Sequence, residues 1–141
     1  MSEKNVEIMG RLFVEFQAGE ERGDRGAWFD SEAVADDVEW IFETDAAFEG
    51  QTVWRGRDGF VEFMRTWTED FEGWSIRIER LIDAGDDRVV VLTHQSATGK
   101  GSGAPVELKV GQVYALEDGR LVRVRNYLSH AEALEATGLR E

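Results

Sequence analysis

Two amides and one histidine are the side chains of this sequence best suited to chemistry inside a sheet. His94 lies in a strand-like segment at 88–98, and its imidazole can exchange a proton near neutral pH. Gln112 and Asn126 lie in two further segments of this kind, and strand alternation puts Gln112 on the same face as Tyr114. The two amides could hydrogen-bond a ligand carbonyl, or they could satisfy each other as a polar pair in the core. Both interpretations stay open, and so does the face of the strand to which His94 points.

Other groups with catalytic or ligand-binding character do not form a site. Asp36 and Asp37 precede Glu39, but adjacent residues on a loop point apart and no histidine lies nearby. Solvated charge therefore explains these acids better than a metal or glycosidase site. The glycine-rich segment 99–103 lacks the strand-to-helix context of a phosphate-binding loop. Because the chain also has no cysteine, which excludes thiolate ligands, we predict no metal and no cofactor.

The composition limits the partners that the chain can bind. Its 141 residues carry 16 Lys and Arg against 29 Asp and Glu, and the resulting net charge of −13 argues against nucleic acid. No apolar run approaches the length of a membrane span, and the N-terminus does not resemble a signal peptide. We therefore expect a cytoplasmic protein without membrane association, and the length fits a single domain over residues 1–141.

The order of helical and strand periodicities predicts the fold class. Apolar residues recur at helical spacing in two segments, 3–22 and 57–71. Strand-like spacing occurs in residues 38–42, 74–84, 88–98, 106–116 and 121–128. The segment 44–56 is expected to be a loop, and a capping box from Ser129 to Glu132 starts a last short helix. Helices followed by closely spaced strands predict an α+β fold with an antiparallel sheet.

Five short motifs in this order resemble a known family. They are WRGRDGF at 54–60, GDDRVVVL at 85–92, GKGSG at 99–103, EDGRLVR at 117–123, and EALEA at 132–136 with Gly138 and Leu139. Together they resemble the SnoaL-like branch of the nuclear-transport-factor-2-like superfamily, which also holds ketosteroid isomerase, scytalone dehydratase and limonene-epoxide hydrolase. The resemblance implies a cystatin-like roll, in which a cone-shaped, curved antiparallel sheet packs on N-terminal helices around a deep apolar pocket. It also implies a homodimer formed through the sheet.

The resemblance implies that the two amides lie in the pocket, but this chain lacks the acid–base residues that the family usually has there. Gln112 falls near the position where the isomerase keeps an oxyanion-stabilising acid, and Asn126 is its neighbour. Relatives of the isomerase have an Asp at the end of the first strand, where this chain has Ile41 or Phe42. They also have a Tyr on the first helix, where this chain has Phe16. None of these three side chains can move a proton.

Two candidate bases remain under the resemblance. Glu43 lies just beyond the first strand and would have its pKa raised by burial if the loop folded inward, although a solvated loop glutamate is the simpler interpretation. His94 stands where relatives often have Arg, and it would be a base only if it faced the pocket rather than the outer, dimer-forming face.

Aromatic side chains would supply most of the pocket wall. The candidates are Phe16, Trp40, Trp54, Phe63, Trp67 and Tyr114. Trp54, in the loop before the second helix, is expected at the pocket mouth, and Phe16 at the narrow end. Aromatic residues at these spacings also form ordinary cores, so a core role is the alternative.

Three functions follow from the resemblance and its departures. The first is a pocket protein that binds a small apolar molecule carrying a carbonyl. The second is a cofactor-independent isomerase, cyclase, dehydratase or hydrolase, with His94 or Glu43 as base and Gln112, Tyr114 and Asn126 orienting the substrate. The third is a dimeric scaffold whose pocket is filled by its own aromatic side chains. The missing acids favour binding over catalysis.

Overall fold

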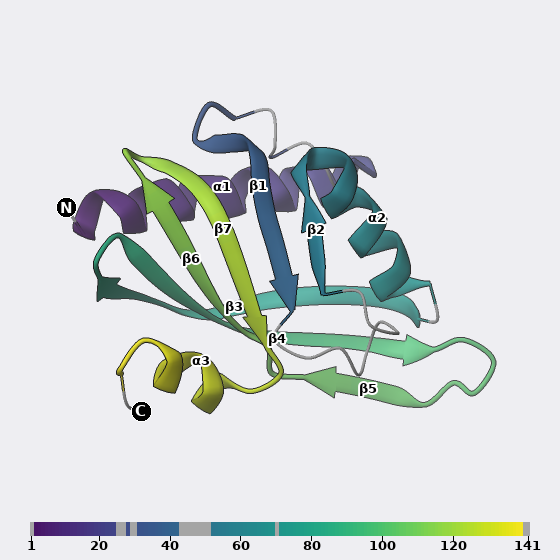
Figure 1. The fold of residues 1–141 in the computed structure, drawn as a ribbon. Coiled ribbons are helices and arrows are strands. Elements are labelled where there is room, and N and C mark those ends of the chain that lie inside the picture. The colour runs from purple at the N-terminus through teal and green to yellow at the C-terminus, as the bar shows by residue number, and fades with distance from the viewer. Residues whose placement is uncertain (1, 25–27, 29–30, 43–51, 70, 140–141) are drawn as a thin grey trace.

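The computed structural model describes residues 2–24, 28, 31–42, 52–69 and 71–139. Its helices are α1 (Ser2–Arg22), α2 (Gly56–Thr68) and α3 (His130–Ala136). Its strands are β1 (Val34–Phe42), β2 (Val53–Arg55), β3 (Phe71–Gly85), β4 (Arg88–Gly99), β5 (Pro105–Leu108), β6 (Gly111–Glu117) and β7 (Arg120–Tyr127). The long helix α1 crosses behind the sheet and α3 lies in front of it (Figure 1). These elements confirm the predicted α+β class and the curved sheet packed on N-terminal helices.

The sheet is mixed rather than antiparallel. Its strand order is β2-β1-β7-β6-β4-β3, with β5 paired to β4. All pairings are antiparallel except that of β1 with β7, which is parallel. The prediction of an antiparallel sheet was wrong at this pairing because β1 and β7 come from opposite ends of the chain. Sequence periodicity identifies both strands but does not show which strand lies beside which.

The hairpin of β3 and β4 gives the sheet much of its curvature. Its register runs from Phe71 opposite Gly99 to Gly85 opposite Arg88, with shifts at three places along β3. Each β-bulge of this kind bends the strand and increases its twist. The bent sheet therefore wraps around α1 and α2 on what we call its inner face, while α3 packs on the opposite, outer face.

Apolar residues cover both faces of the central strands. The main core lies between the inner face, α1 and α2, and it includes Val89 and Val91 of β4. A second cluster on the outer face joins Val90 and Leu92 to Leu134 of α3. Because successive strand residues point to opposite faces, the continuous apolar run of β4 serves both clusters.

Three boundaries differ from the sequence prediction. The second helix ends at Thr68, and Phe71 pairs with Gly99 as part of β3 instead of continuing the helix. The predicted loop before that helix contains the short strand β2. The predicted strand 106–116 is two strands, β5 and β6, because β5 pairs with the far end of β4 and the chain then shifts before β6 begins.

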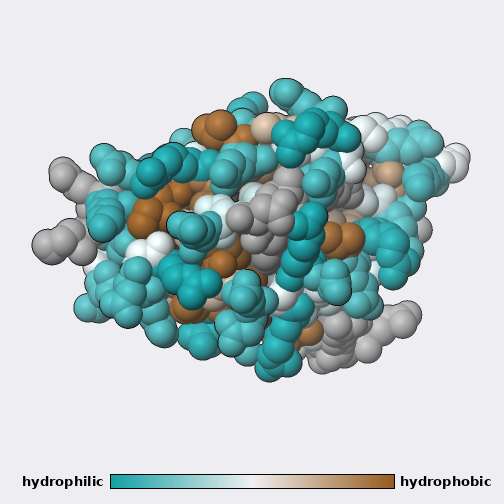
Figure 2. Space-filling model, turned by 90° about the horizontal axis from the view of Figure 1, so that it is seen from above, coloured by the Kyte–Doolittle hydropathy of each residue, from teal (hydrophilic) through white to brown (hydrophobic). Residues whose placement is uncertain are grey.

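The molecular surface agrees with the charged composition. Seen from above, the molecule is mostly hydrophilic, and its hydrophobic residues form small separate patches (Figure 2). Among the described helices, none is long and apolar enough to cross a membrane. The described residues likewise contain no group of three or more His, Cys, Asp or Glu that could hold a metal ion.

The close approach of α3 to β6 predicts a strong effect at Gly111. A methyl group there would lie 2.6 Å from Cβ of Ala133 and 3.0 Å from the carbonyl oxygen of Ser129, so α3 would have to move. We expect Gly111→Ala to lower the free energy of unfolding by about 1–3 kcal/mol in urea denaturation. Gly10→Ala is the matched control, because a methyl group there meets nothing within 4 Å in the α1 helix. It should raise stability by about 0.5–1 kcal/mol, and equal losses in both variants would contradict the contact.

Candidate functional site

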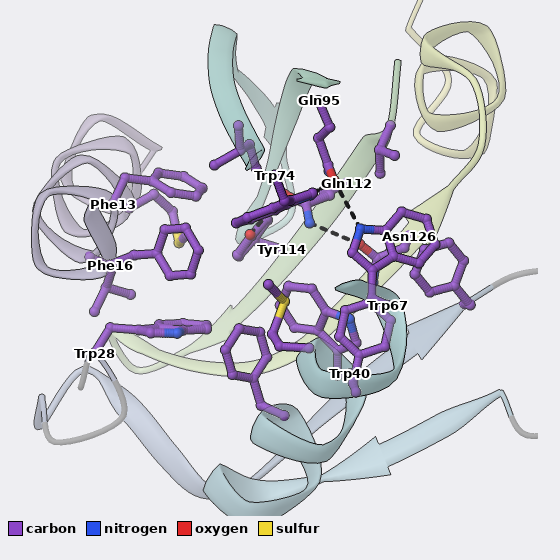
Figure 3. A pocket seen from close by; sticks show the side chains of 18 residues that line it. Phe13, Phe16, Trp28, Trp40, Trp67, Trp74, Gln95, Gln112, Tyr114 and Asn126 are labelled. Atoms are coloured by element: carbon purple, nitrogen blue, oxygen red, sulfur yellow. Dashed lines mark hydrogen bonds between the residues drawn. The ribbon is translucent and has the colours of Figure 1, made fainter. Parts of the chain in front are cut away.

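A small cavity lies between the inner face of the sheet and the helices α1 and α2. Its volume is about 40 Å³, which leaves room for about three water molecules. Ten of its lining residues are aromatic: Phe13, Phe16, Trp28, Trp40, Phe42, Phe60, Phe63, Trp67, Trp74 and Tyr114. Figure 3 shows these side chains converging from α1, α2 and several strands. The cavity is therefore an aromatic enclosure that its own side chains largely fill.

Edge-to-face contacts hold the aromatic walls in place. The ring centroid of Phe60 on α2 lies 4.8 Å from the ring centroid of Trp40 on β1 and 5.2 Å from that of Trp28. Phe16 of α1 contacts the same Phe60 ring at 6.5 Å. Such T-shaped pairs are favoured by the aromatic quadrupole and add to the free energy of burial. Apolar residues at helical spacing on α1 and α2 thus form one joined wall.

A chain of hydrogen bonds forms the polar side of the cavity. The Tyr114 hydroxyl donates to Oε1 of Gln112 at 2.9 Å, and Nε2 of Gln112 donates to Oδ1 of Asn126 at 2.8 Å. Nδ2 of Asn126 then donates to the carbonyl oxygen of Ile41 at 2.9 Å. The chain crosses β6, β7 and β1, because Gln112 lies opposite Asn126 in the antiparallel register and Asn126 lies beside β1 in the parallel one.

This geometry is compatible with both interpretations of the two amides. Gln112 and Asn126 are buried and satisfy each other, as a polar core pair would. They also line the cavity together with Tyr114. An amide NH₂ group has two N–H donors, so each amide retains one donor beyond the bonds described.

Gln95 is a third amide among the described lining residues of the cavity, and sequence reasoning missed it. Its Oε1 accepts from the indole nitrogens of both Trp67 and Trp74, each at 3.1 Å. Its Nε2 lies 3.4 Å from the hydroxyl of Thr93. The signal in the sequence was the position of Gln95 in β4, two residues after Thr93 and therefore on the same face. Gln95 joins tryptophans from α2 and β3 at one side of the cavity.

Trp40 brings a hydrogen-bond donor without an acceptor. Its side chain lines the cavity and is only 7% exposed. The indole Nε1 is buried, and no atom of the described chain accepts its hydrogen. A buried donor without a partner is costly, and a bound molecule with an acceptor would remove that cost.

The cavity carries no charge among its described lining residues. Tyr114 is the one ionisable side chain among them, and burial raises its pKa well above the usual value of 10.0. The phenol therefore stays protonated at physiological pH and acts as a neutral group.

The structure places one of the two predicted bases, His94, away from this cavity. His94 lies on the outer face of β4, where Nε2 is 2.7 Å from Oε1 of Glu107 and Nδ1 is 3.0 Å from the guanidinium of Arg77. Since Gln95, the next residue, points inward, His94 must point outward. Glu43 lies outside the described residues.

The other predicted binding residues divide between lining and support. Phe16, Trp40, Phe63 and Trp67 line the cavity, as do Gln112, Tyr114 and Asn126. Trp54 does not: it is buried on β2 with its ring 5.0 Å from that of Phe63, behind the cavity wall. The expectation of Trp54 at a pocket mouth fails because residues 53–55 form a strand beside β1 rather than a loop.

Comparisons with known proteins agree on the fold. The SnoaL-like domain matches residues 13–124. An NTF2-like protein of unknown function from Burkholderia pseudomallei is 24% identical, with a TM-score of 0.68 over 96% of this chain and 97% of that one. A putative SnoaL-like polyketide cyclase from Jannaschia sp. CCS1 is 20% identical, with a TM-score of 0.68 over 89% and 85%.

A third solved structure extends the likeness. It is a hypothetical protein with a ketosteroid isomerase-like fold from Catenulispora acidiphila, in complex with trimethylamine. It is 16% identical, with a TM-score of 0.65 over 92% of this chain and 93% of that one. The comparison with curated proteins found no match. Identities this low show a shared fold and leave the activity open.

Burial of Tyr114 predicts its behaviour at high pH. In the variant Tyr127→Phe, Tyr114 is the remaining tyrosine, and its phenolate absorbance should appear only as the protein unfolds. Because the folded-state pKa is raised, stability is unaffected below the unfolded value of about 10 and falls as the pH rises above it. Absorbance and circular dichroism recorded together against pH would check this. Reversible phenolate formation near pH 10 in the folded protein would contradict the burial.

Proposed function

The chain belongs to the SnoaL-like domain family, and on that premise we propose that its cavity binds a small, uncharged, apolar molecule that carries a carbonyl group. Aromatic side chains make up most of the described lining, which suits a flat or apolar body. The described lining residues include no charged group that would compensate an ionic ligand. A neutral molecule is therefore the ligand that enters at the lowest electrostatic cost.

The unpartnered donor of Trp40 carries this proposal. Its Nε1 needs an acceptor, and the second N–H groups of Gln112 and Asn126 are further donors at the same cavity. A carbonyl oxygen is an acceptor only, and it has two lone pairs. The donors of the cavity therefore match a carbonyl better than a hydroxyl or an amine.

Binding requires the cavity to widen. A volume of about 40 Å³ is below the roughly 300 Å³ at which ligand pockets usually begin. Phe13, Trp67 and Trp74 are the described lining aromatics that are only partly buried. We propose that these three side chains move to admit the ligand, with the more deeply buried rings serving as the fixed wall.

A substitution that keeps the ring but removes the donor tests the role of Trp40. Trp40→Phe should weaken binding of acetophenone about fivefold, because one hydrogen bond of about 1 kcal/mol is lost. Binding of ethylbenzene, which has no carbonyl, should change much less. Titration calorimetry of both compounds would measure the difference. Trp54→Phe is the matched control, since Trp54 lies behind the wall, and it should leave both affinities unchanged.

Two outcomes would contradict the proposal. If neither compound binds to the unmodified protein, the cavity is filled by its own side chains and the scaffold function is favoured. If Trp40→Phe weakens both compounds equally, the indole contributes packing and the carbonyl is recognised elsewhere.

Catalysis by Glu43 is the second candidate function, because Glu43 directly follows Phe42, which lines the cavity. As a base, its carboxylate would take a proton from the carbon next to the ligand carbonyl and return one from solvent. Exchange of the methyl protons of acetophenone for deuterium in deuterium oxide, followed by NMR, reports this step. Catalysis predicts exchange above the buffer rate that disappears in Glu43→Gln. Binding alone predicts the buffer rate in both proteins.

A further inference from the structure

A second hollow lies on the outer face, away from the aromatic cavity. Its volume is about 270 Å³, and Arg88, Arg123 and Arg125 line it. Val113 and Ala115 form part of the same lining. Three arginines around one hollow contrast with the net charge of −13 for the whole chain. The hollow is larger than the aromatic cavity, and its described lining is positively charged whereas that of the cavity is neutral.

The hollow is one end of a row of charges that crosses the sheet. In the registers of β2, β1, β7, β6 and β4, the successive neighbours are Arg55, Glu39, Arg123, Ala115 and Arg88. Glu39 bridges its two neighbours: its Oε2 lies 3.1 Å from Nη2 of Arg55, and its Oε1 lies 3.0 Å from Nε of Arg123. The row thus alternates in charge until Ala115, which separates Arg123 from Arg88.

Glu39 shows what an arginine pair in this row does to a carboxylate. The hydrogen bond from Arg123, with a further one from Arg55, holds the pKa of Glu39 below its usual 4.5 despite some desolvation. Two arginines flanking a carboxylate across neighbouring strands therefore favour its ionised form. Arg123 and Arg88 flank Ala115 in the same way, but alanine brings no charge.

From this position without a carboxylate, which we call the vacancy at Ala115, we infer a second binding site. In it, a small organic acid places its carboxylate above Ala115, between Arg88 and Arg123. Strands in a sheet are about 4.8 Å apart, so the two arginine backbones are separated by about 10 Å, and both side chains reach the midpoint. The short side chain of Ala115 leaves that midpoint open. This site is independent of the aromatic cavity and of the function proposed for it.

Arg88 has the capacity to bind the carboxylate. Its nearest ion-pair partner, Asp86, is 3.8 Å away, and the Asp86 side chain is 92% exposed. Nε of Arg88 is buried, and no atom within the described ranges accepts its hydrogen. The described bond of Arg123 to Glu39 uses one of the five N–H donors of a guanidinium. Val113 and Tyr127 offer an apolar surface for the body of the acid.

Benzoate and benzamide test the site as a matched pair of probes. Titrations followed by NMR of the arginine Nε–H groups should show binding of benzoate that weakens with added salt, and no comparable binding of benzamide. Arg88→Gln should weaken benzoate at least about tenfold, because a charged hydrogen-bond donor is lost. Arg11→Gln makes the same charge change on exposed α1, on the other side of the sheet, and should have little effect.

Ala115→Glu provides a second, independent test. Its carboxylate would occupy the gap as Glu39 occupies the preceding one, so benzoate binding should be lost while thermal stability is kept or raised. Loss of binding in Arg11→Gln equal to that in Arg88→Gln would overturn the site, because only overall charge would then matter.

The oligomeric state, measured in the same titration, shows whether a second copy of the chain occupies the site instead of a small acid. A homodimer through the sheet, which the family resemblance implies, would bring a second copy to this face. A stable dimer that dissociates in Arg88→Gln and never binds benzoate would show that the occupant is a carboxylate of the partner copy. That result would overturn the small-molecule site.

Discussion

The parallel pairing of β1 with β7 is the constraint on which both candidate sites depend. On the inner face it brings the carbonyl of Ile41 to Asn126 and thereby completes the buried hydrogen-bond chain. On the outer face the same pairing sets Glu39 beside Arg123. Because side chains alternate along a strand, neighbouring residues of β1 serve opposite faces. A shift of one residue in this register would exchange the two sets and destroy both arrangements.

The two proposed sites would use different physical means to recognise a ligand. The described lining of the inner cavity is neutral, so its selectivity would come from shape and from a few donors whose hydrogen bonds are strong in a low-dielectric surrounding. The outer hollow is lined by three arginines, so its selectivity would come from paired charges and would be subject to screening by salt. Curvature of the β3–β4 hairpin separates these environments, because it wraps one face around the helices and turns the other outward.

Much of the fold could be predicted from local periodicity, and the candidate site only in part. Apolar spacing located α1 and most of the strands, and alternation put Gln112 on the same face as Tyr114, because both patterns depend only on neighbours in the chain. The family resemblance then implied that Gln112, Tyr114 and Asn126 share one pocket, and all three line the cavity. The inward position of Gln95 and the outward position of His94 depend on the register of β4, which the pairing with β3, β5 and β6 determines. The vacancy at Ala115 was not predictable, because it depends on strands that are distant in sequence.

The shared acceptor at Gln95 has a consequence for how this sequence can change over evolutionary time. Both lone pairs of Oε1 are engaged by indoles, one from Trp67 and one from Trp74. A replacement at position 95 that cannot accept two hydrogen bonds removes the acceptor of two partly buried indole donors, whereas loss of one tryptophan leaves the amide still engaged by the other. During evolution, one of the two tryptophans should therefore be replaced before Gln95 is. The residue types at positions 67, 74 and 95 should vary together among relatives.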